Sequence, residues 1–301
     1  MKHHVHDEVM RMQGFVKKHY WENIGVEEVA EYVGYSPRWC NLLFKICCGE
    51  TLGTYLRILR MEDAKRLLES NIPVDRVALS LSYTPRGFRK AFREYFGVSP
   101  SDYVKTGKAY GRYSEIYEYR GEKNWGKGKN PTPDGLWEFD YYLPEEKKYG
   151  RMVWSDSEEF RSPQWGIASS PQWYCCNRWS GYGMHPGRAS ESVKTFLCPR
   201  DGEVDVFFSV GRVFPFRVTY SPFWHSWETP CAARLYLNGV PLGDAAVMTS
   251  VDPVFMTATC RVKAGDRISL HIDPMKQHQC DGVNLYLQRV SYRNPDFESG
   301  K

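Results

Sequence analysis

VEEVAEYVGYSPRWCNLLFKICCGETLGTY, residues 26–55, is followed 48 residues later by VDRVALSLSYTPRGFRKAFREYFGVSPSDY, residues 74–103. The two stretches align without a gap, and nine of their 30 positions are identical. Two unrelated amphipathic helix pairs would rarely share so many residues together with the same turn signals, so we interpret the stretches as an internal repeat. The identical pairs are Val26/Val74, Val29/Val77, Ala30/Ala78, Tyr35/Tyr83, Pro37/Pro85, Arg38/Arg86, Phe44/Phe92, Gly49/Gly97 and Tyr55/Tyr103.

The first copy has the pattern of a helix-turn-helix. Apolar residues recur on one face of a predicted helix over residues 26–33, which ends at Gly34, a common C-cap residue. Ser36 is a favourable N-cap for the next helix, and Pro37 suits its first position, where the missing N–H costs nothing. This second helix is expected to bury Cys40, Leu43, Phe44 and Cys47.

The second copy repeats these signals, with Thr84 as the N-cap and Pro85 at the first helical position. Its second helix is expected to bury Phe88, Ala91, Phe92 and Tyr95. Between the copies, residues 51–70 predict a helix of about 30 Å. Successive major-groove faces of B-DNA lie about 34 Å apart, so this helix would hold two recognition helices at adjacent grooves. It is expected to bury Leu52, Tyr55, Leu56, Leu59, Met61, Ala64, Leu67 and Leu68.

The outward faces of the two second helices carry residue types that read DNA. Arg and Asn side chains near a helix N-terminus reach guanine and adenine edges, and basic residues farther along the helix contact phosphates. Any surface helix can carry a charged face, but the repeat favours DNA binding over that alternative. The predicted DNA-binding residues are Arg38, Trp39, Asn41 and Lys45 in the first copy and Arg86, Gly87, Arg89, Lys90 and Arg93 in the second.

Motifs across residues 7–105 resemble the AraC/XylS family of transcription regulators. The resemblance rests on Gly34-Tyr35-Ser36-Pro37, on Tyr55-Leu56-Arg57-Ile58-Leu59-Arg60-Met61, and on Phe92-Arg93-Glu94-Tyr95-Phe96-Gly97-Val98-Ser99-Pro100-Ser101-Asp102-Tyr103. It implies that this part of the chain binds double-stranded DNA through two helix-turn-helix units. The chain departs from the family pattern at Leu42, where an Arg or Lys is common, and at Ser82, where a Gly is common. Most members also place the DNA-binding module last rather than first.

The carboxy-terminal half predicts a β-sandwich of jelly-roll type. Its segments are short, rich in β-branched and aromatic residues, and separated by turn signals such as Asn238-Gly239 and Gly265-Asp266. Residues 137–154 predict an additional hairpin, and the region is loosely similar to jelly-roll modules of carbohydrate-active proteins. The predicted strands cover residues 192–198, 203–210, 214–220, 232–238, 257–262, 267–272 and 283–291.

We therefore expect a multidomain α + β chain. An all-α double helix-turn-helix domain over residues 1–107 is followed by a linker over 108–133 and by an all-β sandwich over 134–293, which is expected to bind an effector or to mediate dimerisation. No apolar run approaches the roughly 20 residues of a membrane helix. The His-rich start has no apolar stretch behind it, so we do not expect a signal peptide, and nine cysteines without a C-x-x-C motif indicate reduced thiols in the cytoplasm.

Aromatic residues in the second half indicate a small-ligand site. Eight of the ten tryptophans lie between Trp125 and Trp227. Aromatic rings combined with a few polar groups form sites for sugars, although the same rings could belong to the core. The predicted ligand-binding residues are Trp173, Trp179, His185, Trp224 and Trp227.

The sequence thus favours a DNA-binding transcription regulator that responds to a sugar-like effector and controls carbohydrate use. RNA polymerase and a second copy of the chain are further candidate partners, and the sequence is compatible with activation and with repression. Walker, G-x-S-x-G, H-E-x-x-H and Cys-His zinc motifs are missing, so no catalytic residue, metal or cofactor is predicted. The alternatives are a lectin-like protein or a carbohydrate-active enzyme with a helical adaptor.

Overall fold

A computed structural model of the chain describes residues 5–119, 129–155, 164–167, 170–178, 183–187, 189–212, 230–250, 252–275, 283–295 and 297. The chain forms two compact units. The helical unit contains residues 1–117 together with 290–301, and the sandwich unit contains residues 118–289.

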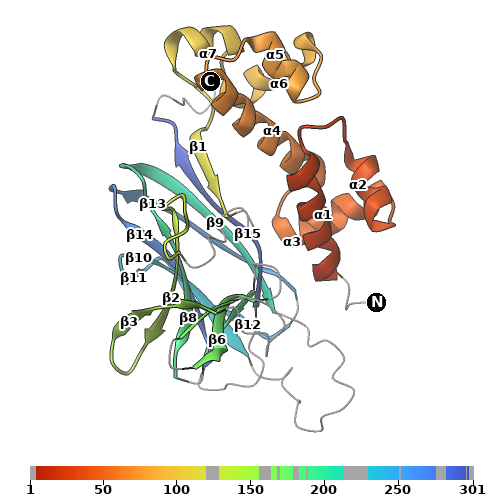
Figure 1. The fold of residues 1–301 in the computed structure, drawn as a ribbon. Helices are drawn as coiled ribbons and strands as arrows, with labels where there is room; N and C mark the ends of the chain where they lie inside the picture. The colour runs from red at the N-terminus through yellow and green to blue at the C-terminus, as the bar shows by residue number, and fades with distance from the viewer. Residues whose placement is uncertain are drawn as a thin grey trace. The chain divides into compact units, whose positions relative to one another are not determined.

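Seven described helices form the helical unit. Figure 1 shows α1, α2 and α3 gathered at one end of α4, with α5, α6 and α7 at the other end. Helix α4 has 18 residues and is therefore about 27 Å long. The predicted pair of helix-turn-helix units joined by one long helix is confirmed. The helices are α1 (Val5–His19), α2 (Val26–Val33), α3 (Pro37–Cys48), α4 (Leu52–Glu69), α5 (Val74–Ser80), α6 (Pro85–Phe96) and α7 (Pro100–Thr106).

The predicted caps set the start and the end of both α3 and α6. The Ser36 hydroxyl accepts a hydrogen bond from the Trp39 backbone N–H at 3.3 Å, and Thr84 accepts one from Gly87 at 3.1 Å. Both helices end at a glycine in the left-handed region, where a side chain would be strained: Gly49 has φ 78° and Gly97 has φ 71°. The same local chemistry therefore makes α3 and α6 equally long, at 12 residues each.

The core of the helical unit follows the predicted periodicity with small differences. Helix α3 buries all four predicted residues and also Cys48. Helix α6 buries Phe88, Phe92 and Phe96, whereas Ala91 and Tyr95 are half-buried. Tyr95 stays near the surface because its hydroxyl donates a hydrogen bond to Glu62 at 2.9 Å. On α4, every predicted core residue is buried except Leu67, which is half-buried.

Two antiparallel sheets dominate the second half of the chain. Trp137 on β2 lies 6.4 Å from Phe208 on β9, ring centre to ring centre, so the sheets pack face to face. In the first sheet the order is β13 (Val254–Val262), β9 (Gly202–Arg212), β15 (Val283–Arg293), β7 (Gly183–His185), β6 (Ser170–Arg178), β5 (Gln164–Ile167) and β4 (Val153–Ser155), and β1 (Tyr113–Glu118) pairs with β15. In the second sheet the order is β11 (Val240–Pro241), β10 (Cys231–Leu237), β14 (Arg267–Asp273), β8 (Glu191–Leu197), β2 (Trp137–Leu143) and β3 (Lys148–Arg151), and β12 (Ala246–Met248) pairs with β10.

Six of the seven predicted strands are present, and the predicted turn at Asn238-Gly239 joins β10 to β11 with both residues at positive φ. The seventh strand, over residues 214–220, lies outside the described residues. The predicted hairpin forms between β2 and β3. The expected linker over residues 108–133 contains β1. Among the described helices, none combines the length and the apolar character that a membrane span needs.

Candidate DNA-binding site

Helix α6 exposes a row of cations. Arg86, Arg89, Lys90 and Arg93 are exposed, and Gly87 among them is half-buried. The opposite side of α6 is fixed in the core by its three buried phenylalanines. All five predicted residues therefore lie on the side of the helix that faces away from the core.

Two of these cations have partners that a nucleic acid could replace. Arg89 pairs with Asp75 on α5 at 2.7 Å, and Lys90 lies 3.8 Å from Glu94 on its own helix. Exposed ion pairs contribute about 0.2–1 kcal/mol because water and salt screen them. Within the described part of the chain, Arg86 and Arg93 form no ion pair.

Helix α3 presents a different surface. Arg38, Trp39 and Lys45 are exposed as predicted, and neither cation pairs with another described residue. Asn41 is only half-exposed, and its Oδ1 atom is buried without a hydrogen-bond partner in the described structure. Because its amide oxygen points inward, Asn41 is less accessible to a base than the sequence pattern suggests.

The first helix-turn-helix is anchored to α4 through one arginine that sequence reasoning did not single out. The Arg60 guanidinium donates hydrogen bonds to the carbonyl oxygens of Tyr20, Glu22 and Ile24 at 2.6, 2.7 and 2.9 Å. These carbonyls belong to the loop between α1 and α2. Arg60 therefore fixes the position of the first unit on the long helix.

The comparisons with known proteins concern this same part of the chain. A family model described as a helix-turn-helix domain matches residues 29–106. The transcriptional activator AarP of Providencia stuartii is 32% identical over 89 residues, which are 29% of this chain and 66% of AarP. The regulatory protein SoxS of Escherichia coli K12 is 30% identical over 91 residues, which are 30% of this chain and 85% of SoxS. The chain belongs to the AraC/XylS family.

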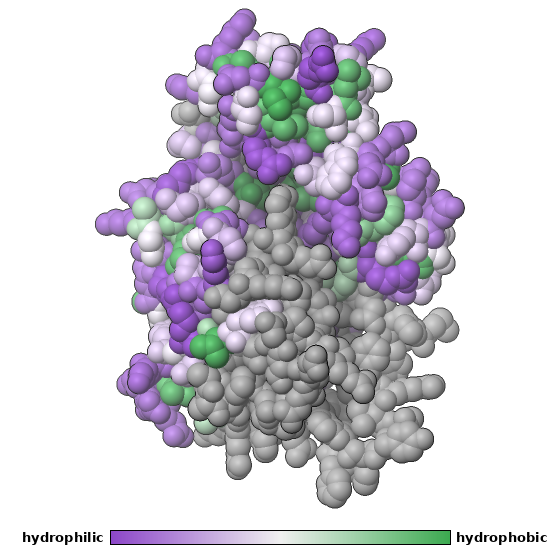
Figure 2. Space-filling view, in the orientation of Figure 1, coloured by the Kyte–Doolittle hydropathy of each residue, from purple (hydrophilic) through white to green (hydrophobic). Residues whose placement is uncertain are grey.

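One solved structure is similar in sequence to the same part of the chain. The carboxy-terminal domain of AraT, a response regulator from Geobacillus stearothermophilus, is 31% identical, and the match covers 33% of this chain and 84% of that domain with a TM-score of 0.32. The residues that the family model matches, 29–106, contain both α3 and α6. Over the helical unit, the face shown in Figure 2 is mainly hydrophilic, with small hydrophobic patches.

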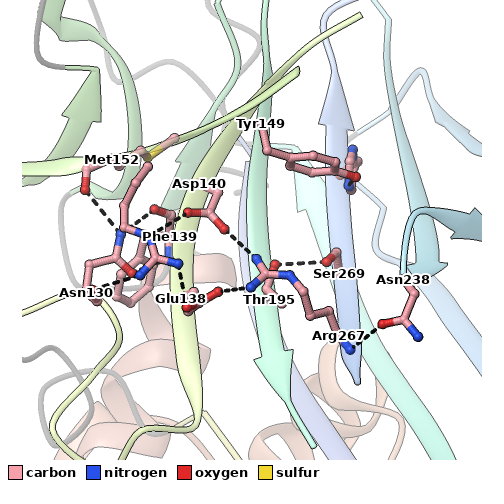
Figure 3. Close-up of polar contacts among 12 residues, drawn as sticks. Asn130, Glu138, Phe139, Asp140, Tyr149, Met152, Thr195, Asn238, Arg267 and Ser269 are labelled. Atoms are coloured by element: carbon pink, nitrogen blue, oxygen red, sulfur yellow. Dashed lines mark hydrogen bonds and ion pairs between the residues drawn. The ribbon is translucent and has the colours of Figure 1, made fainter. Parts of the chain in front are cut away.

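Outside the helical unit, the second sheet carries a cluster of paired charges. Figure 3 shows Arg267 of β14 reaching toward two carboxylates of β2, Glu138 and Asp140. It donates hydrogen bonds to both, and the bond to Asp140 measures 2.8 Å. Arg151 of β3 approaches the same carboxylates, at 2.6 Å from Glu138 and 3.6 Å from Asp140. The two carboxylates and the two guanidinium groups thus neutralise each other's charge.

An aromatic group adjoins these charges on the same side of the sheet. Asp140 and His271 belong to one cross-strand row, so their side chains share a face, which we call the polar face. His271 interacts through Nδ1 with Glu191 at 2.6 Å and through Nε2 with the Tyr149 hydroxyl at 3.1 Å. Tyr149 lies on β3 and His271 on β14, and these strands are three strand spacings apart, about 14 Å in a flat sheet. Because the two side chains nevertheless meet, the sheet must curve toward the polar face. The Tyr236 ring centre lies 4.2 Å from that of His271.

Burial changes the acidity of one carboxylate in the polar face. Removal from water, reinforced by the neighbouring Glu138 carboxylate, raises the pKa of Asp140 to about 6, although Arg267 and Arg151 act in the opposite direction. Asp140 can therefore exchange a proton near neutral pH, and its protonated form is a hydrogen-bond donor.

Only one of the predicted ligand-binding residues has a described side chain. His185 is half-buried at the end of β7, and its Nδ1 atom lies 2.8 Å from the Pro186 carbonyl oxygen. Trp173 belongs to β6, but its side chain is outside the described residues, as are Trp179, Trp224 and Trp227 altogether. The polar face was not predicted. Its local signal is the alternation of charged and aromatic residues along β2, where Glu138 and Asp140 interleave with Trp137 and Phe139 and all four are buried.

Proposed function

We propose that this chain is a sequence-specific DNA-binding transcription regulator of the AraC/XylS type. The observation that carries the proposal is the pair of repeated helices α3 and α6, each with an inner side buried in the core and an outer side that exposes cations, two on α3 and four on α6. In this proposal, residues of α6 near its N-terminus read base edges, and cations farther along α3 and α6 contact phosphates. A regulator of this kind acts where chromosomal DNA lies, in the cytoplasm.

The two roles predict different effects of alanine substitution. Arg86→Ala or Arg89→Ala should weaken binding to the preferred duplex by about 1–3 kcal/mol and relax the preference at one position, because an arginine that reads guanine donates two hydrogen bonds. Lys45→Ala should weaken binding to all duplexes alike, because a phosphate contact carries no sequence information. Affinities for a selected and for a random duplex distinguish these results. Equal losses on both duplexes in all three variants would contradict base reading by α6.

We also infer that the sandwich unit binds a neutral, polyhydroxylated effector such as a sugar, and that the polar face is the site. Its charges are paired internally, so it has little surplus charge to attract an ion. Its accessible donors for hydroxyl groups are the guanidinium groups of Arg151 and Arg267, whose side chains are 47% and 36% exposed, whereas Glu138 and Asp140 are buried. Tyr149, which is 43% exposed, adds an accessible ring of the kind that packs on sugar faces.

This effector proposal is testable by ligand-dependent stability. Neutral mono- and disaccharides are titrated into the full chain while tryptophan emission follows thermal unfolding. A saccharide at 100 times its Kd should stabilise the native state by about 2.7 kcal/mol, and Tyr149→Ala should reduce that gain. Val240→Ala serves as the matched control, since Val240 is 65% exposed at the β10–β11 turn, away from the polar face. A thermal unfolding midpoint that no sugar changes would contradict the proposal. So would a sugar-dependent gain in stability that is as large in Tyr149→Ala as in wild type.

A further inference from the structure

Helix α3 exposes three large apolar side chains in a row. Trp39 is 43% exposed, Leu42 is 49% exposed and Ile46 is 48% exposed. They are spaced by three and four residues, so they share one side of the helix. We call them the apolar stripe. The stripe is not part of the core, because α3 already packs into the core through Cys40, Leu43, Phe44, Cys47 and Cys48.

The corresponding surface of α6 has no such stripe. The repeat places Gly87, Lys90 and Glu94 at the positions of Trp39, Leu42 and Ile46. Lys90 and Glu94 are charged, exposed and only 3.8 Å apart. The two helices therefore offer different chemistry at equivalent positions, although each has a hydroxyl N-cap, a first-turn proline and a glycine C-cap.

Cations lie beside the apolar stripe. Arg38 precedes Trp39 and Lys45 precedes Ile46, and both cations are exposed. An apolar centre with positive neighbours complements the major groove wherever thymines occur. There the C5 methyl group of thymine is an apolar contact point, and phosphates line the edges of the groove.

We propose that α3 reads thymine methyl groups through the apolar stripe, whereas α6 reads guanine through arginine. The inference rests on the proposed DNA-binding function and adds the base class that each helix recognises. The preferred site should consist of two unlike halves, one containing thymines that face α3 and the other containing guanines that face α6.

The test replaces thymine by deoxyuridine, which differs only in the missing methyl group. The preferred duplex is first selected from a random library with the full chain, and each thymine is then replaced in turn. Loss of one buried methyl contact should lower affinity about fourfold, at positions confined to one half of the site. In Leu42→Ala or Trp39→Ala, replacing thymine by deoxyuridine should lower the affinity less than it does in wild type. Lys90→Ala, at the position of α6 that corresponds to Leu42, is the matched control: it should weaken binding to thymine and deoxyuridine duplexes alike and leave the ratio of the two affinities as in wild type.

The outcomes separate this inference from the function on which it rests. Salt-dependent binding that is indifferent to deoxyuridine at every position would overturn the inference and leave the DNA-binding function standing. A deoxyuridine effect that is equally large in wild type, Leu42→Ala and Trp39→Ala would also overturn it. A full chain that binds no duplex DNA would overturn both.

Discussion

Replacing Phe92 by alanine is expected to lower the free energy of unfolding of the helical unit by about 3–5 kcal/mol, the usual range for removing a buried phenyl ring. Phe92 is completely buried, and its ring centre lies 5.6 Å from Phe88, 4.4 Å from Phe96 and 5.7 Å from Tyr103. The substitution removes the ring at the centre of this cluster. Alanine is too small to fill the space, so a cavity remains beneath the second recognition helix.

Chemical denaturation of the full chain, followed by circular dichroism at the helical band, measures this loss. Leu79→Ala is the matched control, because Leu79 is 65% exposed on α5 in the same half of the unit and its truncation should change stability by less than about 0.5 kcal/mol. Binding to duplex DNA should weaken in Phe92→Ala and stay unchanged in the control. A loss below about 1 kcal/mol would mean that the aromatic cluster does not hold α6 in place.

The helical unit could be predicted closely because its signals are local. The bounds of α2, Val26–Val33, match the prediction residue for residue, and both recognition helices begin at the predicted proline. A cap, a first-turn proline and a left-handed glycine each act within a few residues of the helix end. Because the stretch is repeated, the same signals predict the ends of both α3 and α6.

The polar face could not be predicted in the same way. Glu138 and Arg267 are 129 residues apart in the chain, and only the strand order β14-β8-β2 brings them together. Alternation along β2 indicated which side chains share a face, but not which strand lies opposite. A charge pair across such a distance depends on sheet topology, for which the sequence carries no local signal.

The apolar stripe was recognised only in part. The exposed positions of Trp39 and Leu42 followed from the helical period, and the same period places Ile46 beside them. Ile46 was assigned neither to the buried side nor to the outward side of the helix. A comparison of α3 with α6 at each repeated position would have found it, since Glu94 stands at the equivalent position.

The central claim is that the cationic surfaces of α3 and α6 bind duplex DNA, and the salt dependence of affinity tests it most directly. Binding that neutralises phosphates releases counterions, with a slope of about −0.9 in log K against log salt for each contact. The two helices expose six candidate cations: Arg38, Lys45, Arg86, Arg89, Lys90 and Arg93. If all six contact phosphates or lie close to them, the slope is about −5, and affinity falls about 10³-fold between 50 and 200 mM salt.

Fluorescence anisotropy of a labelled duplex, titrated with the full chain at several salt concentrations, gives the slope. The account predicts a steep slope in wild type, a slope shallower by about two in the Lys45→Ala, Arg93→Ala double variant, which removes two proposed phosphate contacts, and no change in Arg261→Ala, which removes an exposed cation from β13 of the sandwich. Affinity that is independent of salt, or a slope that the double variant leaves untouched while Arg261→Ala reduces it, would contradict the account.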